Sequence, residues 1–337
     1  MSALTNPPTD PASSDALDRS VRDCSDTDTP RLPADDFRLD IWASRPPTVE
    51  VLAAGPSATV QDLGRPGLGE LGVGTSGALD RPSLRLANRL VGNPEPHAAI
   101  EATFGGLRVR FTHAALVAVT GAPCPVSVRG RCEGMYAPIH VYAGDELWLG
   151  TPTSGMRSYL AVRGGIEVPM VLGARATDTL AGLGPARLAP GSALRIGTRT
   201  LAYPNVGLAP QPRYPGRPVL RVLPGPRQDW FVDGALAALC DRGGYEVTAQ
   251  SNRIGIRLSG PTLAHRHVRE LPPEPTVTGA LQVPPAGQPI LFLADHPVTG
   301  GYPVIAVVHP DDVPLAAQAR PGQRIRFALA THPERQR

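Results

Sequence analysis

From Val49 onward, apolar and polar residues alternate over runs of about four to seven residues, which is the period expected of β-strands. A first series of such runs extends from VEVLA to RSYLAVRGG, and a second extends from VLRVLPG to RIRFALA. Short runs bounded by turn residues are typical of sandwiches and barrels. The pattern therefore predicts a mainly β protein with two β-rich subdomains.

A few short helices interrupt the strand pattern. Asp80 is suited to cap the segment RPSLRLANRLVGN, in which Pro82 occupies the first turn and Gly92 can end the helix. The segments at 230–240 and 311–319 carry weaker helical patterns. We expect helices at all three places.

Composition divides the chain into four parts. Residues 1–47 are rich in Pro, Ser, Thr and Asp, so they predict a disordered extension. The Pro-rich stretch at 204–218 is expected to link an N-terminal β-rich subdomain at 48–203 to a C-terminal β-barrel subdomain at 219–330.

Arginine provides all 33 basic residues, since the chain has no lysine. This excludes a Walker A, Schiff-base or biotinylated lysine on this polypeptide. The formal net charge is +3, and aromatic residues make up only 5% of the chain, so nucleic-acid binding is not expected and small anionic ligands fit better.

The four cysteines lie at spacings that predict neither a disulfide framework nor a zinc site. No apolar run is long enough to cross a membrane, and no signal peptide is evident. We therefore expect a cytoplasmic protein.

The stretch VQDLGRPGLGELGVGTSGALD (60–80) contains two G-x-G-x-x-G patterns. A dinucleotide fingerprint also needs a preceding strand and a surrounding βαβ unit, and neither is visible. The glycines instead predict a tightly folded loop whose backbone closely approaches another group. Asp62 and Arg65 are near enough in sequence to pair, either to hold the shape of the loop or to bind a ligand.

A second loop, GALQVPPAGQPILFLADHPVTGGYP, has the same character. Gln282 and Asp295 flank an apolar strand, and Gly300, Gly301 and Tyr302 form a turn whose backbone N–H groups could bind an anion. Between the two loops, SNRIGIRLSG is expected to present Arg253 and Arg257 on one face, where guanidinium groups could grip a carboxylate.

Two further chemistries to consider are a serine nucleophile and a histidine metal site. Ser76 could be a nucleophile, but its flanks do not form a G-x-S-x-G elbow, which favours a hydrogen-bonding role in the loop. His265 and His267 could share a face and bind a metal; without an identifiable third ligand, a surface pair is preferred and no metal site is assigned.

The ordered motifs VQDLGRPG, VGTSGALD, AAIEATFGG, SNRIGIRLSGP, TGALQVPPAGQPI and LADHPVTGGYPVIAVV resemble the KipI-antagonist family, also called allophanate hydrolase subunit 2 or the C subunit of 5-oxoprolinase. The resemblance covers about residues 49–328. It implies a cyclophilin-like β-barrel architecture and a working partnership with a KipI-like subunit. The chain departs from the family at Pro273-Glu274-Pro275, His296-Pro297-Val298 and Ile256, which leaves the exact substrate open.

For bacterial members, the resemblance implies ATP-dependent opening of 5-oxo-L-proline to L-glutamate with a third subunit of the LamB/YcsF type. ATP with Mg²⁺ would then act at the level of the complex, and the chain alone would be inactive. Two alternatives stay open: a carboxyltransferase component of a biotin-dependent urea carboxylase/allophanate system, with biotin on a partner chain, and a non-catalytic KipI-binding regulator.

Ring opening of a lactam requires an activated carbonyl, donors for anionic oxygens and a carboxylate for proton transfer. The residues predicted to be catalytic are Asp62, Asp80 and Asp295, with Glu101 as a further carboxylate. The residues predicted to bind substrate are Arg65, Ser76, Arg253, Arg257, Gln282, Gly300, Gly301 and Tyr302. All of these assignments require the two loops to meet at one cleft.

Overall fold

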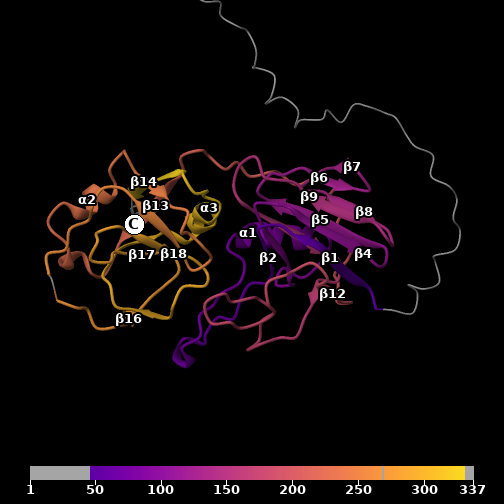
Figure 1. The fold of residues 1–337 in the computed structure, drawn as a ribbon, viewed down its shortest axis with the longest axis horizontal. Helices are drawn as coiled ribbons and strands as arrows, with labels where there is room; N and C mark the ends of the chain where they lie inside the picture. Colours follow the sequence, from indigo (N-terminus) through magenta and orange to yellow (C-terminus); the bar gives the residue numbers. More distant parts are fainter. Residues whose placement is uncertain (1–45, 268, 331–337) are drawn as a thin grey trace, which may run out of the picture. The chain divides into compact units, whose positions relative to one another are not determined.

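The computed structural model describes residues 46–267 and 269–330 (Figure 1). The expected disordered extension at 1–47 lies outside these residues except for its last two positions. In the described part of the chain, strands predominate and the helices are short. The prediction of a mainly β protein containing a barrel is confirmed.

Two antiparallel sheets are formed by strands from residues 48–196. The seven-stranded sheet has the order β11 (Ile166–Glu167), β12 (Ala193–Ile196), β1 (Thr48–Ala54), β4 (Leu107–Phe111), β9 (Glu146–Leu149), β6 (Val126–Val128) and β7 (Arg131–Glu133). The five-stranded sheet has the order β2 (Ser57–Gln61), β3 (Ala99–Thr103), β10 (Arg157–Val162), β5 (Ala115–Gly121) and β8 (Pro138–Val141).

The five-stranded sheet is buried on both faces, which explains why β10 contains no exposed residue. Successive side chains point to opposite faces of a strand. Leu160 and Val162 enter the core shared with the other sheet, whereas Tyr159 and Ala161 pack against the helix α1 (Arg81–Leu90). The sheet is therefore the middle layer between the second sheet and α1.

The predicted cap of α1 is confirmed. Asp80 Oδ1 accepts a hydrogen bond from Ser83 N at 3.1 Å, and Pro82 lies in the first turn, where its missing N–H costs nothing. The two weaker helices are single turns, α2 (Ala235–Leu239) and α3 (Val313–Ala317), and three short 3-10 turns are η1 (Gly69–Leu71), η2 (Gln228–Trp230) and η3 (Pro310–Asp312). Among the helices of the described residues, none is long and apolar enough to cross a membrane.

Strands from residues 219–329 close into a barrel. Its order is β13 (Val219–Pro224), β20 (Val304–Val308), β17 (Ala280–Gln282), β18 (Ile290–Phe292), β15 (Gly255–Ser259), β14 (Tyr245–Val247) and β21 (Arg324–Leu329). The pairing of β13 with β21 is parallel and closes the barrel. A separate two-stranded ladder joins β16 (Glu274–Pro275) to β19 (Thr299–Gly300).

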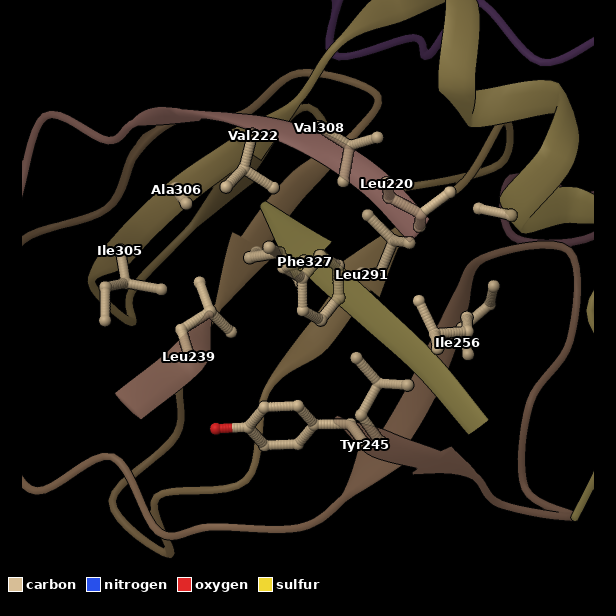
Figure 2. Packing of buried hydrophobic residues seen from close by; sticks show 14 of the residues in the cluster. Leu220, Val222, Leu239, Tyr245, Ile256, Leu291, Ile305, Ala306, Val308 and Phe327 are labelled. Carbon is tan, nitrogen blue, oxygen red and sulfur yellow. The ribbon is translucent and has the colours of Figure 1, made fainter. Parts of the chain in front are cut away.

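Apolar side chains fill the barrel, as Figure 2 shows for Leu220, Tyr245, Leu291 and Phe327. Each of these four is at most 1% exposed. The stretch predicted as a linker, 204–218, has no helix or strand. The domain boundaries drawn from the sequence stay a prediction.

Leu220→Ala should lower the free energy of unfolding by about 2–5 kcal/mol, because it leaves a cavity in the barrel core. Leu223→Ala, in the same strand but 38% exposed, should cost less than about 1 kcal/mol. Equilibrium urea denaturation of both variants measures the difference. Equal losses would contradict the assignment of the two faces of β13.

Candidate functional site

The two loops singled out from the sequence meet at Arg253 and Asp295. Arg253 Nε lies 2.9 Å from Asp295 Oδ2, and Arg253 Nη2 lies 3.0 Å from Asp295 Oδ1, so the pair is bidentate. Arg253 also donates to Glu101 Oε1 on β3 and to the Gly77 carbonyl, the latter at 2.6 Å. A single guanidinium therefore connects a barrel loop to the five-stranded sheet.

Asp295 accepts three more hydrogen bonds from residues outside the barrel. Ser76 Oγ lies 2.7 Å from Oδ1, while Thr179 N and Oγ1 lie 3.0 and 2.7 Å from Oδ2. Burial alone would raise the pKa of the Asp295 carboxyl, but the Arg253 charge and these hydrogen bonds outweigh it and hold the pKa below its ordinary value. Asp295 is thus an ionised carboxylate with its acceptor sites occupied.

Glu101 completes what we call the buried ion cluster, defined as Ser76, Glu101, Thr179, Arg253 and Asp295. Its Oε2 accepts hydrogen bonds from the Tyr159 hydroxyl at 2.7 Å and from Leu79 N at 3.1 Å. Arg157 Nε lies 4.0 Å from Oε1. Every charged member of the cluster is at most 7% exposed.

The sequence prediction missed Thr179 within the cluster and Arg157 and Tyr159 beside it. Thr179 lies in a segment to which we assigned no role, and its sequence carries no clear signal. Arg157 and Tyr159 did carry a signal in the sequence, because they interrupt an otherwise apolar run in β10 and a buried polar group needs a partner.

The predicted pairing of Asp62 with Arg65 is wrong as a direct bond, because both side chains bind the segment 171–178. Asp62 Oδ1 accepts from Gly64 N at 2.8 Å, and Oδ2 accepts from Arg175 N at 2.6 Å. Arg65 Nη2 donates to the Ala176 carbonyl at 2.6 Å. Each side chain thus holds the shape of the loops.

Arg65 also lies 3.7 Å from Asp178, and it is only 2% exposed. Burial raises the pKa of the Asp62 carboxyl despite the hydrogen bonds that it accepts. Asp62 is therefore a carboxyl with raised proton affinity, and Arg65 is a buried structural cation.

The two arms of the glycine-rich loop approach each other closely at Gly64 and Gly77, so these two glycines need no bound phosphate to explain them. A Cβ placed on Gly64 would lie 2.3 Å from the Thr75 carbonyl oxygen, and one on Gly77 would lie 2.7 Å from Gly64 N. The two arms of the loop are therefore in backbone contact.

Asp80 lies in a separate polar group near the start of α1. Besides capping the helix, it accepts hydrogen bonds from Gln318 Nε2 at 2.8 Å and from the Tyr214 hydroxyl at 3.2 Å. Burial raises the pKa of its carboxyl, although the hydrogen bonds that it accepts oppose the rise. Tyr214 also anchors the stretch 204–218 to the sheets.

The predicted common face of Arg253 and Arg257 is wrong. Alternation applies only within a strand, and Arg253 precedes β15, so its side chain turns inward while Arg257 is exposed. Arg257 borders a shallow pocket together with Gln250 and Gln288, apart from the buried ion cluster.

Gln282, Gly300, Gly301 and Tyr302 gather at the end of the two-stranded ladder. Gln282 Nε2 donates to the Tyr302 carbonyl at 3.0 Å and lies 2.4 Å from where a Cβ on Gly300 would be. Gln282 is thus engaged by the turn, and Tyr302 is 46% exposed. Neither residue contacts the buried ion cluster through any hydrogen bond of the described residues, so the eleven predicted site residues do not form one cleft.

A cavity of about 460 Å³ opens beside Asp62, within the part of the chain that forms the two sheets. We call it the Asp62 cavity; its ionisable lining residues are Asp62, His97, Glu167, Arg175 and Arg199. Arg65 and Asp295 do not line it. Asp62 is the one predicted site residue among its lining residues.

A closed barrel joined through a buried ion cluster to a two-sheet unit defines a two-part β protein. The family model for the carboxyltransferase domain, subdomain A and B, matches residues 71–329, and the chain belongs to this family.

Two bacterial relatives match most of the chain. It is 39% identical over 282 residues to the C subunit of 5-oxoprolinase from Escherichia coli K12, covering 83% of this chain and 90% of the relative. The protein of the same name in Haemophilus influenzae is 34% identical over the same shares. Urea amidolyase of Saccharomyces cerevisiae is 30% identical, but the match spans only 17% of that protein.

Solved structures agree on the fold. The crystal structure of TTHA0988 has a TM-score of 0.77 at 36% identity; the match covers 84% of this chain and 56% of that one. The Kluyveromyces lactis urea amidolyase has a TM-score of 0.79 at 29% identity over 85% of this chain. The chain spans about half the length of the first protein and 19% of the second.

Arg253→Gln should lower the free energy of unfolding at pH 7 by about 3–5 kcal/mol, because it leaves two buried carboxylates without their cation. Arg257→Gln, at an exposed position in the adjoining strand, should change it by less than about 0.5 kcal/mol. Equilibrium urea denaturation measures both. An Arg253→Gln loss as small as that of the control would contradict a structural role for the cluster.

The loss of free energy of unfolding caused by Arg253→Gln should become smaller as the pH falls from 7 to 4. In the parent protein the pKa of Asp295 is lowered, so its stabilisation is present above the unfolded pKa of about 3.9 and is lost as the pH falls through the folded pKa. Without the guanidinium, burial should raise that pKa, and protonation should then relieve the buried charge. The same denaturation series at several pH values measures this; a constant deficit would contradict it.

Proposed function

We propose that the chain is the C subunit of a 5-oxoprolinase, which opens 5-oxo-L-proline to L-glutamate at the expense of ATP. The observation that carries this proposal is the 39% identity to the C subunit of a bacterial 5-oxoprolinase across 83% of this chain and 90% of that one. Identity that extends over nearly the whole of both chains supports a shared role in a way that a fold alone does not.

The urea carboxylase alternative has weaker support. The matching urea amidolyases contain this region as 17% of their length, so most of what acts in them lies elsewhere. The present chain also has no lysine to carry biotin, and a biotinyl group would have to come from another polypeptide. We therefore keep this alternative second.

We propose that ATP with Mg²⁺ acts at the level of the complex. The chain lacks a Walker A lysine, and the two arms of its glycine-rich loop pack against each other at Gly64 and Gly77. The proposed partners are a KipI-like subunit and a LamB/YcsF-like subunit, as the family resemblance implies. An active site completed by these partners would leave the chain inactive alone.

Asp62 is the residue that we assign to proton transfer. Ring opening adds water to the lactam carbonyl carbon, breaks the C–N bond and delivers a proton to nitrogen, so the site needs a carboxyl that can exchange protons. The pKa of Asp62 is raised and its side chain borders a cavity, whereas Asp295 is ionised with its acceptor sites occupied. Asp295 and Asp80 then serve as positioning residues.

The purified chain should not hydrolyse 5-oxoproline, and mixing it with both partner subunits and ATP–Mg²⁺ should yield equimolar glutamate and ADP. Glutamate is measured by chromatography and ADP by a coupled assay, with omission of each subunit as the control. A reconstituted complex that forms but produces no glutamate would sink the proposal.

Asp62→Asn should lower kcat of the complex by about 10²–10⁴, the usual contribution of a positioned acid or base. The matched control is Glu70→Gln, an exposed carboxylate in the same loop, which should leave kcat unchanged. Binding to the partner subunits should stay intact in both variants, as measured by size-exclusion chromatography. Full activity of Asp62→Asn would instead favour a non-catalytic, partner-binding role for the chain.

A further inference from the structure

The Asp62 cavity has features of a built ligand site. Its walls come from segments far apart in sequence, namely residues 62–64, 96–98, 164–167, 170–175 and 197–199. A volume of about 460 Å³ is within the range of small-molecule pockets. No side chain of the buried ion cluster occupies it.

One buried polar atom in the cavity has no partner. His97 Nδ1 is inaccessible to solvent and makes no hydrogen bond within the described residues. Such atoms are rare in folded proteins, and each one calls for a specific explanation. Gly165 closes off this nitrogen, so a ligand in the cavity can reach the imidazole only through its other nitrogen, Nε2.

The backbone holds the imidazole against the cavity wall. A Cβ on Gly165 would lie 2.9 Å from His97 Nδ1, so this position accepts no larger residue without moving the ring. Asn88 Nδ2 donates to the His97 carbonyl at 2.8 Å, which fixes the backbone from the other side. Nδ1 is therefore held against the Gly165 backbone, and Nε2 is the ring nitrogen left for a ligand.

Two guanidinium groups lie close enough to affect the imidazole. Burial lowers the pKa of His97, and the charges of Arg199 and Arg175 lower it further, so the ring is neutral near pH 7. Arg175 Nε donates to the Val168 carbonyl at 2.9 Å, which leaves the four N–H groups on its terminal nitrogens to face other acceptors. Arg199 is exposed at the mouth.

These groups match the parts of a small cyclic amide that carries a carboxylate. Guanidinium groups bind carboxylates through parallel hydrogen bonds. A neutral imidazole nitrogen can accept from an amide N–H or donate to its carbonyl, according to its tautomer. Asp62, with its raised proton affinity, borders the same space.

We propose that the Asp62 cavity is the carboxylate-lactam site of this chain, with Arg175 and Arg199 binding the carboxylate and His97 hydrogen-bonding the ring amide. The identification of the lactam rests on the proposed function, whereas carboxylate recognition follows from the lining residues. The arginines singled out from the sequence, Arg65 and Arg253, are then structural, and substrate recognition moves to two arginines that the sequence did not mark.

The test measures ligand binding by the full chain without its partners, using saturation-transfer NMR. The probes are 5-oxo-L-proline and 2-pyrrolidinone, which shares the ring amide but lacks the carboxylate. We expect saturation transfer to the first and at least about tenfold weaker binding of the second, because a charge-assisted bidentate contact is lost. Equal binding of both, or binding of neither, would overturn the proposal.

Arg199→Gln and His97→Ala should each weaken binding of 5-oxo-L-proline at least about tenfold. Arg199 is exposed, so its loss should not impair folding, and the melting temperature of both variants is measured alongside. Arg187→Gln, an exposed arginine outside the cavity, is the matched control and should bind like the parent. Unchanged binding in Arg199→Gln and His97→Ala together would refute the site.

The same variants in the reconstituted complex separate this inference from the proposed function. Arg199→Gln should raise KM for 5-oxoproline at least about tenfold and change kcat little, because it affects binding rather than bond breaking. An active complex in which KM is unchanged would keep the proposed function and reject this cavity. An inactive complex with carboxylate-dependent binding in the cavity would keep the site and reject the proposed activity.

Discussion

The structure depends on the placement of one cation, the Arg253 guanidinium, between two buried carboxylates. Removing three charges from water is costly, and only close contacts with satisfied hydrogen bonds offset that cost. Here Arg253 binds Asp295 through two nitrogens and Glu101 through a third. Because Glu101 lies in β3 and Asp295 follows β18, the same contact fixes a barrel loop against the five-stranded sheet.

The buried ion cluster around Arg253 also fixes the loops beside it. Ser76, which bonds Asp295, belongs to the glycine-rich loop. Thr179, which also bonds Asp295, directly follows the segment 171–178 that Asp62 and Arg65 bind. The cluster therefore positions both loops, and none of its members lines the Asp62 cavity. Through these loops the cluster is connected to Asp62 and to the segment 171–178, both of which border the Asp62 cavity. Rigid support of this kind is what a site needs to keep its side chains in a productive geometry.

The sequence predicted the elements of the fold better than it predicted the contacts between them. Strand runs, the cap at Asp80 and the ends of α1 follow from local rules, because each depends on residues a few positions apart. The meeting of the two loops was also predicted, and Ser76 and Arg253 both contact Asp295.

What the sequence could not give was which arginine meets which carboxylate. Arg65 and Asp62 are three residues apart, yet each bonds a segment more than 100 residues away. Arg253 and Arg257 are an even number of residues apart, a spacing that puts side chains on one face within a strand. Their side chains nevertheless point in different directions, because β15 begins between them. Arg175 and Arg199 look like ordinary surface arginines in the sequence. Only the fold brings them beside His97, because long-range contacts follow from how the sheets are connected and not from residue spacing.

Burial alone therefore does not identify a catalytic carboxylate, and the three predicted aspartates illustrate why. All are at most 7% exposed, but Asp295 is matched by a cation and donors that stabilise its charged form. For Asp62, desolvation outweighs the donors and the proton is held more tightly. A carboxylate whose negative charge is balanced by a cation and by hydrogen-bond donors stabilises the structure. A carboxylate whose charge is only partly balanced, and which borders a cavity, can exchange a proton with a ligand. On this criterion, Asp62 is the carboxylate that we propose for proton transfer, in the part of the chain that forms the sheets.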